Sequence, residues 1–286
     1  MKKCVLLTIR YSILFSAQTQ GFHMSASQKD YLSYKNNLFS TSRMGMREYF
    51  FENYLLSSLE KVNSNNASDV DFCVLVMCST ELPEKNKNFL VKMQEKYSEW
   101  LNVTYMSPEE VNYGKAMSSF LKSVYKESPV LCATARLDDD DVLFDDYVNV
   151  ISDYLIVDND KKVISFSSGF NLYVEADGFN VIGASEYEFS KIAIGLAYIK
   201  YYNSIDEVVE DNIYKCGNHV KIDKNYDVID YKDKRSFVRI NTELSDRMYR
   251  LDEDERNNRL KIEYRKQKEK RVGLGRVRKN FDNLPI

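Results

Sequence analysis

The sequence lacks an apolar run of about 18 residues, the length that a membrane-spanning helix requires. Lys2 and Lys3 before Cys4–Leu7 imitate the start of a signal peptide, but that apolar stretch is short and Arg10 soon interrupts it. The five cysteines are odd in number and include no Cys-X-X-Cys pair. We therefore expect a cytoplasmic protein whose thiols stay reduced inside an apolar core.

Other absences count against three classes of function. The net charge of −3 gives no reason to expect nucleic acid as a partner. Leu6–Phe15 contains no glycine-rich phosphate loop, which counts against a sugar nucleotidyltransferase. Asp138–Asn149 lacks the spaced acids, central glycine and terminal glutamate of an EF-hand, which counts against a Ca²⁺-binding interaction module. We keep the last two classes as alternatives.

The first half of the chain alternates short apolar runs with segments of helical periodicity. Apolar runs of this length are typical of strands buried on both faces, and they are Cys4–Ile9, Asp71–Cys78, Leu101–Met106 and Pro129–Ala135. Helices are predicted between them, at Met44–Val62, Leu82–Trp100 and Pro108–Lys126. The alternation predicts an α/β fold with a mostly parallel central sheet flanked by helices.

The second half has a different pattern. Beyond a predicted helix at Asp145–Val157, short strands with turns at Ser168–Gly169 and Asp177–Gly178 indicate an antiparallel meander. Ile205–Tyr214 is a further predicted helix, and the polar stretch Gln18–Ser42 is a predicted long loop. The pattern predicts one domain over residues 1–245, followed by a basic helical tail over 246–286.

Four consecutive aspartates, Asp138–Asp141, lie between the apolar run Pro129–Ala135 and the apolar residues Val142–Phe144. Adjacent carboxylates repel one another, so they stay ionised only if they are exposed or if a cation neutralises them. Oxygen ligands suit Mg²⁺ or Mn²⁺, and Mg²⁺ completes its shell with water and substrate phosphates. The alternative is an acidic turn that caps the next helix.

The segment Ala135–Asp141, at the end of a predicted strand, resembles the metal-binding aspartate motif of glycosyltransferases with the GT-A fold. More narrowly, the sequence resembles the bacterial putative rhamnosyltransferase family over most of residues 4–240. The stretches that carry this resemblance are Thr8 with Arg10–Ser12, Arg47 with Leu55–Leu59, Asp71–Val76, Glu81–Pro83, Arg136–Asp141, Phe166 with Ser168–Phe170, and Gly195–Ala197.

The resemblance implies a nucleotide-diphosphate sugar donor in a GT-A fold, with residues 1–145 binding the nucleotide sugar and residues 146–245 binding the acceptor. Asp138 would approach the ribose or the metal, and Asp140 would ligate the metal. Asp141 would contact the donor sugar or hold the loop. The run of four acids permits two registers for the metal ligands, Asp138 with Asp140 or Asp139 with Asp141.

Four further residues are candidates for binding the metal or the donor. His219 would complete the metal shell by resemblance to some enzymes of this fold, or it is an ordinary surface or core histidine. Arg10, Arg47 and Arg136 could neutralise the diphosphate or bind the nucleotide base, because a guanidinium group suits phosphate. Arg136 could instead pair with the aspartates as part of the structure.

An inverting enzyme needs a carboxylate base to deprotonate the acceptor hydroxyl. The candidates are Glu175, Asp177, Glu210 and Asp211, and the Glu210–Asp211 pair resembles the acidic pair of some inverting relatives. A solvated helix face explains that pair equally well. A retaining enzyme would not need the base, and the sequence does not decide the stereochemistry.

The resemblance thus implies a metal-dependent glycosyltransferase with a glycan or lipid-linked saccharide acceptor, in the synthesis of a bacterial surface polysaccharide such as O-antigen or capsule. Gln18–Ser42 is a candidate lid over the donor, and Ser168–Gly169 could line the acceptor site. The basic tail could contact the inner face of the cytoplasmic membrane. Its apolar face is thin, so a solvated charged helix is the alternative.

Overall fold

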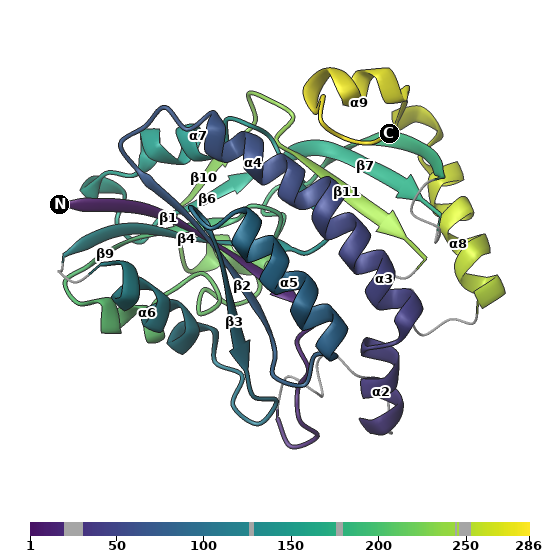
Figure 1. Cartoon of the computed structure of the whole chain (residues 1–286). Coiled ribbons are helices and arrows are strands. Elements are labelled where there is room, and N and C mark those ends of the chain that lie inside the picture. The colour runs from purple at the N-terminus through teal and green to yellow at the C-terminus, as the bar shows by residue number, and fades with distance from the viewer. Residues whose placement is uncertain (20–30, 126–128, 176–179, 244, 246–252) are drawn as a thin grey trace.

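The computed structural model of the chain describes residues 1–19, 31–125, 129–175, 180–243, 245 and 253–286. Within this part the strands form two sheets (Figure 1). The first sheet contains β1 (Lys2–Tyr11), β2 (Asp71–Ser79), β3 (Leu101–Met106), β4 (Val130–Asp138), β6 (Val163–Phe166), β9 (Ala197–Tyr202) and β10 (Val228–Tyr231). The second sheet contains β5 (Val142–Leu143), β7 (Ser168–Val174), β8 (Val181–Glu188), β11 (Phe237–Thr242) and β12 (Arg271–Val272).

The first sheet has the strand order β10-β6-β9-β4-β1-β2-β3. β1 runs parallel to both β2 and β4, β2 runs parallel to β3, and β9 runs antiparallel to β4. The predicted mostly parallel central sheet is therefore confirmed. The order reverses at β1, because the chain builds outward through β2 and β3 and then places β4 on the other side of β1. At such a reversal, the carboxyl ends of the two strands border a crevice that can hold a ligand.

One face of the first sheet is covered by a long helical segment and a shorter helix in front of it (Figure 1). The elements on this face are α3 (Thr41–Phe50), a π-helix (Phe51–Leu56), α4 (Ser57–Ser64) and α5 (Glu84–Lys96). The first three follow one another without a break, so the helix predicted over Met44–Val62 is confirmed. Their apolar side chains pack on Val5 and Leu7 of β1 in the main core.

The opposite face is covered by α6 (Tyr113–Val124) together with a 3₁₀ helix at Ile205–Val209. These elements pack on Cys4 and Leu6, which alternate with the residues facing the main core because successive side chains of a strand point to opposite faces. Of the helix predicted over Ile205–Tyr214, only residues 205–209 are helical, and they form the 3₁₀ helix. Helices thus cover both faces of the first sheet, and the carboxyl ends of β1 and β4 emerge at its edge.

The second sheet begins where the acidic run ends. β5 pairs antiparallel with β11, which runs parallel to β7, and β7 pairs antiparallel with β8. β7 already begins at Ser168, so the turn predicted at Ser168–Gly169 is wrong, and Asp177–Gly178 lies outside the described residues. Gly169 packs closely on β11, because a Cβ atom there would lie 2.5 Å from the carbonyl oxygen of Phe237.

Part of the predicted loop Gln18–Ser42 is helical. Residues 20–30 lie outside the described part, but α2 (Tyr31–Leu38) follows directly, and α3 begins at Thr41. Tyr34 and Leu38 of α2 pack against Leu14 in a small apolar cluster. The loop prediction is therefore wrong for residues 31–42, where apolar side chains at helical spacing bury against the segment that follows β1.

The C-terminal segment contains α8 (Glu253–Lys266) and α9 (Leu274–Asn280), with β12 between them. β12 pairs antiparallel with β8, and Val277, Phe281 and Leu284 are buried in the main core. In Figure 1 this segment lies against the second sheet and the long helix. None of the helices in the described part is long and apolar enough to cross a membrane. The division at residue 245 stays a prediction.

Candidate active site

Arg10 and Asp138 lie side by side as register partners at the carboxyl ends of β1 and β4, where the strand order reverses and a ligand crevice is expected. Nη2 of Arg10 donates a hydrogen bond of 2.6 Å to Oδ1 of Asp138. Burial alone would raise the pKa of Asp138, but the charges of Arg10 and Arg136 outweigh it and lower the pKa to about 2. The side chain of Asp138 is 44% exposed. Asp138 is thus an ionised and accessible carboxylate at the reversal of strand order.

The other three aspartates are buried in the turn between β4 and β5. Asp139, Asp140 and Asp141 are 2%, 9% and 5% exposed. Arg47 reaches the turn from α3, forms an ion pair with Asp139, and lies 3.3 Å from Oδ2 of Asp140. A guanidinium group of the chain itself thus offsets part of the negative charge of these two acids. This placement favours a positioning role for Arg47 over direct contact with a diphosphate.

Asp141 lies under the opposite end of the turn, against β11. Burial raises the pKa of Asp141 well above its ordinary value, and the nearby charges of Asp140 and Asp138 raise it further. The charge of Arg239 and a backbone hydrogen bond from Ile240 act in the other direction. Of the two roles expected for Asp141, the geometry favours holding the loop over contacting a donor sugar.

Two tyrosines that sequence reasoning missed form an aromatic wall next to Arg10. The ring centroids of Tyr113 and Tyr214 lie 4.4 Å apart, and the guanidinium of Arg136 lies 5.8 Å from the Tyr214 ring centroid. The Tyr214 hydroxyl is 2.9 Å from Oγ1 of Thr8 on β1. Arg136 thus packs on an aromatic ring next to the aspartates. The sequence feature that could have indicated this wall is the position of Tyr113, which begins the helix after β3 at the same edge of the sheet.

Gly114 makes this wall possible. A Cβ atom on Gly114 would lie 2.2 Å from the carbonyl oxygen of Val209, so only glycine lets α6 approach the 3₁₀ helix so closely. The close approach brings Tyr113 at the start of α6 next to Tyr214, which follows the 3₁₀ helix.

His219 begins a short 3₁₀ helix, and its Nδ1 lies 2.6 Å from the carbonyl oxygen of Lys191. In the residues that the structure describes, no three His, Cys, Asp or Glu side chains are grouped as a metal site. The structure therefore does not join His219 with Asp138 and Asp140 as a ready three-ligand set. Mg²⁺ needs only one or two carboxylates from a protein, and accessible Asp138 fits such a ligand, whereas the side chain of Asp140 is only 13% exposed.

The carboxylates expected to act as a general base are held in local networks. Asp211 accepts a hydrogen bond of 2.7 Å from the hydroxyl of Tyr198 and lies 3.7 Å from Lys200. Glu210 pairs with Lys215 at 2.9 Å, and Glu175 pairs with Lys261 at 3.2 Å.

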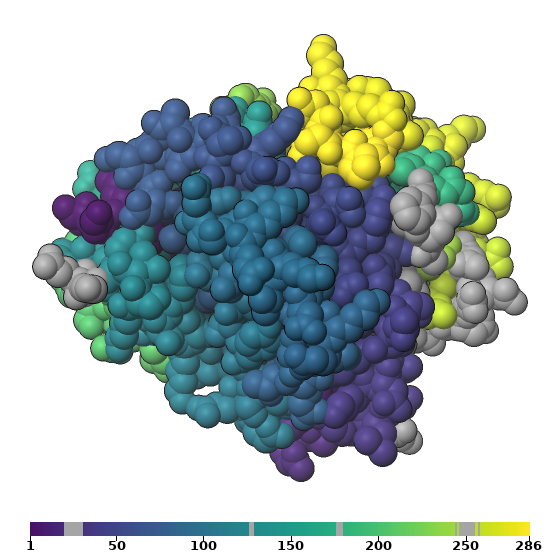
Figure 2. Space-filling view, viewed as in Figure 1, coloured from purple at the N-terminus to yellow at the C-terminus, as the bar shows by residue number. Residues whose placement is uncertain are grey.

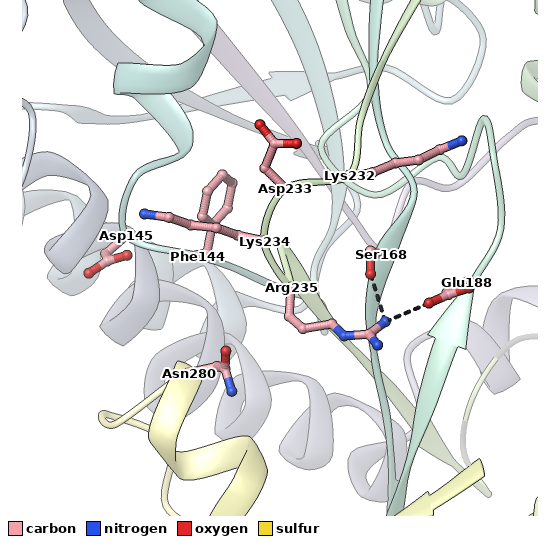
Figure 3. A pocket seen from close by; sticks show the side chains of 9 residues that line it. All are labelled: Phe144, Asp145, Ser168, Glu188, Lys232, Asp233, Lys234, Arg235 and Asn280. Atoms are coloured by element: carbon pink, nitrogen blue, oxygen red, sulfur yellow. Dashed lines mark hydrogen bonds and ion pairs between the residues drawn. The ribbon is translucent and has the colours of Figure 1, made fainter. Parts of the chain in front are cut away.

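The fourth candidate base, Asp177, lies outside the described residues. For the other three, no contact with Asp138 is found in the described part of the chain. Ser168, expected near the acceptor, lines a hollow whose lining does not include Asp138 (Figure 3).

Comparisons with known proteins give a family and a set of solved structures. A family model described as "Putative rhamnosyl transferase" matches residues 4–249. A search of curated proteins finds no match.

Solved structures with a similar fold include a putative glucose-1-phosphate thymidylyltransferase from Bacillus anthracis, at 9% identity and a TM-score of 0.36 over 82% of this chain and 88% of that chain. Another is the inositol-1-phosphate CTP transferase from T. maritima, at 10% identity and a TM-score of 0.36 over 87% of this chain and 94% of that chain. A third is 4-diphosphocytidyl-2C-methyl-D-erythritol synthase from Anaerococcus prevotii, at 10% identity and a TM-score of 0.35 over 81% of this chain and 90% of that chain.

Proposed function

Because the chain belongs to the putative rhamnosyl transferase family and is thus a glycosyltransferase, we propose that its nucleotide-diphosphate sugar donor binds at the carboxyl ends of β1 and β4, in the crevice expected there. The observation that carries the proposal is the pair of Arg10 and Asp138 at the carboxyl ends of the two strands between which the strand order reverses. Arg10 and Arg136 supply positive charge for a diphosphate there, and Asp138 supplies an ionised oxygen ligand.

The donor diphosphate is held together with Mg²⁺ or Mn²⁺ in this proposal. Asp138 is the ligand that the geometry supports best, and Asp140 is a second ligand only if it shares its carboxylate with Arg47. A divalent ion bound there would stabilise the charge that develops on the leaving nucleoside diphosphate. Arg10 orients Asp138 through their hydrogen bond, and the wall of Tyr113 and Tyr214 closes one side of the crevice.

Thermal unfolding of the full chain with UDP, GDP or dTDP, each with and without Mn²⁺, tests the donor site. A ligand that binds only the folded state raises Tm, so we expect at least one nucleotide to raise Tm, and only in the presence of the metal. If none of the three does so in the presence of metal, the donor site is wrong. A separate analysis of the reaction products distinguishes the two enzyme classes. Release of a nucleoside diphosphate indicates sugar transfer, whereas release of pyrophosphate would indicate a nucleotidyltransferase.

We propose further that the enzyme acts on a saccharide of a bacterial surface polysaccharide, free or lipid-linked, at the inner face of the cytoplasmic membrane. Support comes from the charge distribution. Residues 256–279 contain eleven lysines and arginines but two glutamates, whereas the whole chain has a net charge of −3. A cluster of this many cations in the sequence is typical of segments that bind an anionic lipid surface.

The contact with the membrane would be electrostatic rather than an insertion. Of the three apolar residues of α8, Leu260 and Tyr264 pack inward on Tyr173, whereas Ile262 is 45% exposed. Salt screens such an attraction. We expect the full chain to sediment with anionic phosphatidylglycerol vesicles at low salt and to stay in solution at high salt. Equal sedimentation with neutral phosphatidylcholine vesicles would contradict this surface.

A further inference from the structure

A hollow whose lining includes neither Arg10 nor Asp138 lies where the loop 232–235 between β10 and β11 faces the start of β7 and the end of α9 (Figure 3). Its volume is about 470 Å³, which falls within the range of roughly 300–1,000 Å³ for sites that bind small molecules. The lining combines residues from distant parts of the chain, including Phe144, Ser168, Arg235 and Asn280.

The walls of this hollow are fixed by the fold. The Phe144 amide donates to the Ser236 carbonyl at 3.0 Å, and the Ser236 amide donates to the Ser168 carbonyl at 2.7 Å. Arg235 donates a hydrogen bond of 2.6 Å to Oγ of Ser168 and pairs with Glu188 at 3.1 Å. Figure 3 shows the Arg235 side chain crossing the hollow toward these two residues. A ligand would therefore pay little to order this site.

The charges of the lining are balanced. Six lining residues are charged, three of each sign: Lys232, Lys234, Arg235, Asp145, Asp233 and Glu188. Each cation also has a carboxylate partner, because Lys232 pairs with Asp230, Lys234 with Asp146, and Arg235 with Glu188. Because Asp230 and Asp146 lie just outside the lining, these surroundings hold five carboxylates and three cations, which does not favour a polyanion.

A lining in which cations and carboxylates lie side by side suits a neutral ligand with many hydroxyl groups. Ionised carboxylates such as Asp145 and Asp233 only accept hydrogen bonds, whereas Lys234 and Arg235 only donate them. A hydroxyl group does both, so a sugar can satisfy donors and acceptors on the same surface. We propose that the hollow is a second saccharide site, which binds a part of the acceptor glycan remote from the reacting hydroxyl. The proposal rests on the glycosyltransferase function stated above.

The position of the hollow along the chain supports this assignment. Phe144 follows Asp138 by six residues, and an extended chain advances at most about 3.6 Å per residue, so their Cα atoms lie at most about 22 Å apart. An oligosaccharide that enters the crevice can span such a distance. Binding energy from parts of a substrate remote from the reaction can be used to speed the chemical step, so the site would favour long acceptors over short ones.

Amide NMR of the ¹⁵N-labelled full chain tests the site with L-rhamnose, D-glucose and D-galactose as probes, each at up to about 50 mM because single sugars bind at millimolar affinity or weaker. We expect at least one sugar to shift the amides of residues 144–145, 168 and 233–235. Combining Asp145→Asn with Asp233→Asn keeps the shape but weakens both acceptors, and we expect an affinity at least about fivefold lower. Asp158→Asn, at an exposed carboxylate of the 3₁₀ helix Val157–Asn159, is the matched control and should bind as the wild type does.

Three outcomes would overturn the saccharide site. None of the three sugars shifts these amides, the double variant binds as tightly as the wild type, or inorganic phosphate shifts the amides while the sugars do not. Adding UDP, GDP or dTDP with Mn²⁺ to the same sample reads out the crevice around Arg10 and Asp138 independently. A missing nucleotide response contradicts the donor site, whereas a missing sugar response contradicts the hollow alone.

Discussion

Arg47 of α3 and Asp139 of the acidic turn form a buried ion pair across 92 residues of sequence, with side chains 10% and 3% exposed. The pair joins the long helix on one face of the first sheet to the turn that carries the accessible Asp138. Removing one partner of a buried pair leaves the other charge uncompensated, which is far more costly than removing both.

Arg47→Met should therefore lower the free energy of unfolding by about 3–5 kcal/mol. Combining it with Asp139→Asn should restore a large part of that loss, because the carboxylate no longer needs a partner. Urea denaturation of the two single variants and the double variant measures the coupling. If the losses of the two single variants simply add, the pair is not the element that holds the turn.

Asp138→Asn keeps the size of the side chain and removes the charge that faces Arg10. We expect sugar transfer to fall by about 100-fold or more, as it does when a group that stabilises the transition state is lost, while Tm falls modestly, because the variant loses the charge that faces Arg10 on a side chain that is 44% exposed. Initial rates of nucleoside diphosphate release, with circular dichroism as the check on folding, measure both. A variant that transfers sugar at the wild-type rate would remove Asp138 from the site.

The fold of the first half could be predicted because its strands are buried on both faces and so read as unbroken apolar runs. β3 was predicted at its observed bounds, Leu101–Met106, for this reason. β10 and β11 were missed, because Asp230 and Arg239 interrupt their short runs and their pairing partners lie far away in sequence. A local sequence pattern carries no information about which distant strands pair with each other.

The acidic turn could be found because its four carboxylates are adjacent in the sequence. Its surroundings could not, since Arg47 joins it from a helix and Tyr113 meets Tyr214 only through the packing of α6 on the 3₁₀ helix. The sequence indicated a metal as a cation for the acids, which stays a prediction, but it did not indicate Arg47, which pairs with the middle two.

Asp211 gives a test of the general-base prediction. Its carboxylate accepts a hydrogen bond from the hydroxyl of Tyr198, and its backbone carbonyl accepts a 2.5 Å hydrogen bond from the hydroxyl of Tyr202. We expect Asp211→Asn to keep sugar transfer within about tenfold of the wild type, since loss of a true general base typically costs about 10²–10⁴-fold. Tm should fall, because the variant loses the charge that faces Lys200. A loss of activity beyond 100-fold at unchanged Tm would restore Asp211 as the base.

Asp141 should make the stability of the protein depend on pH in an unusual direction. Its pKa is raised in the folded state, chiefly by burial and then by the charges of Asp140 and Asp138. Between the ordinary pKa of an aspartate and this raised value, the folded state binds more protons than the unfolded state, so stability falls as pH rises through that window. The cost of the buried carboxylate is therefore fully present above the raised pKa.

Asp141→Asn removes this cost and keeps the shape of the side chain. We expect the variant to have a higher Tm than the wild type at neutral pH, and the difference to shrink as pH falls below the ordinary pKa of an aspartate, where the carboxyl group is protonated in both states. Asp153→Asn, at an exposed carboxylate on α7 (Tyr147–Tyr154), is the control for a general effect of charge removal. A difference in Tm that stays constant from acid to neutral pH would show that Asp141 is not a buried acid with a raised pKa.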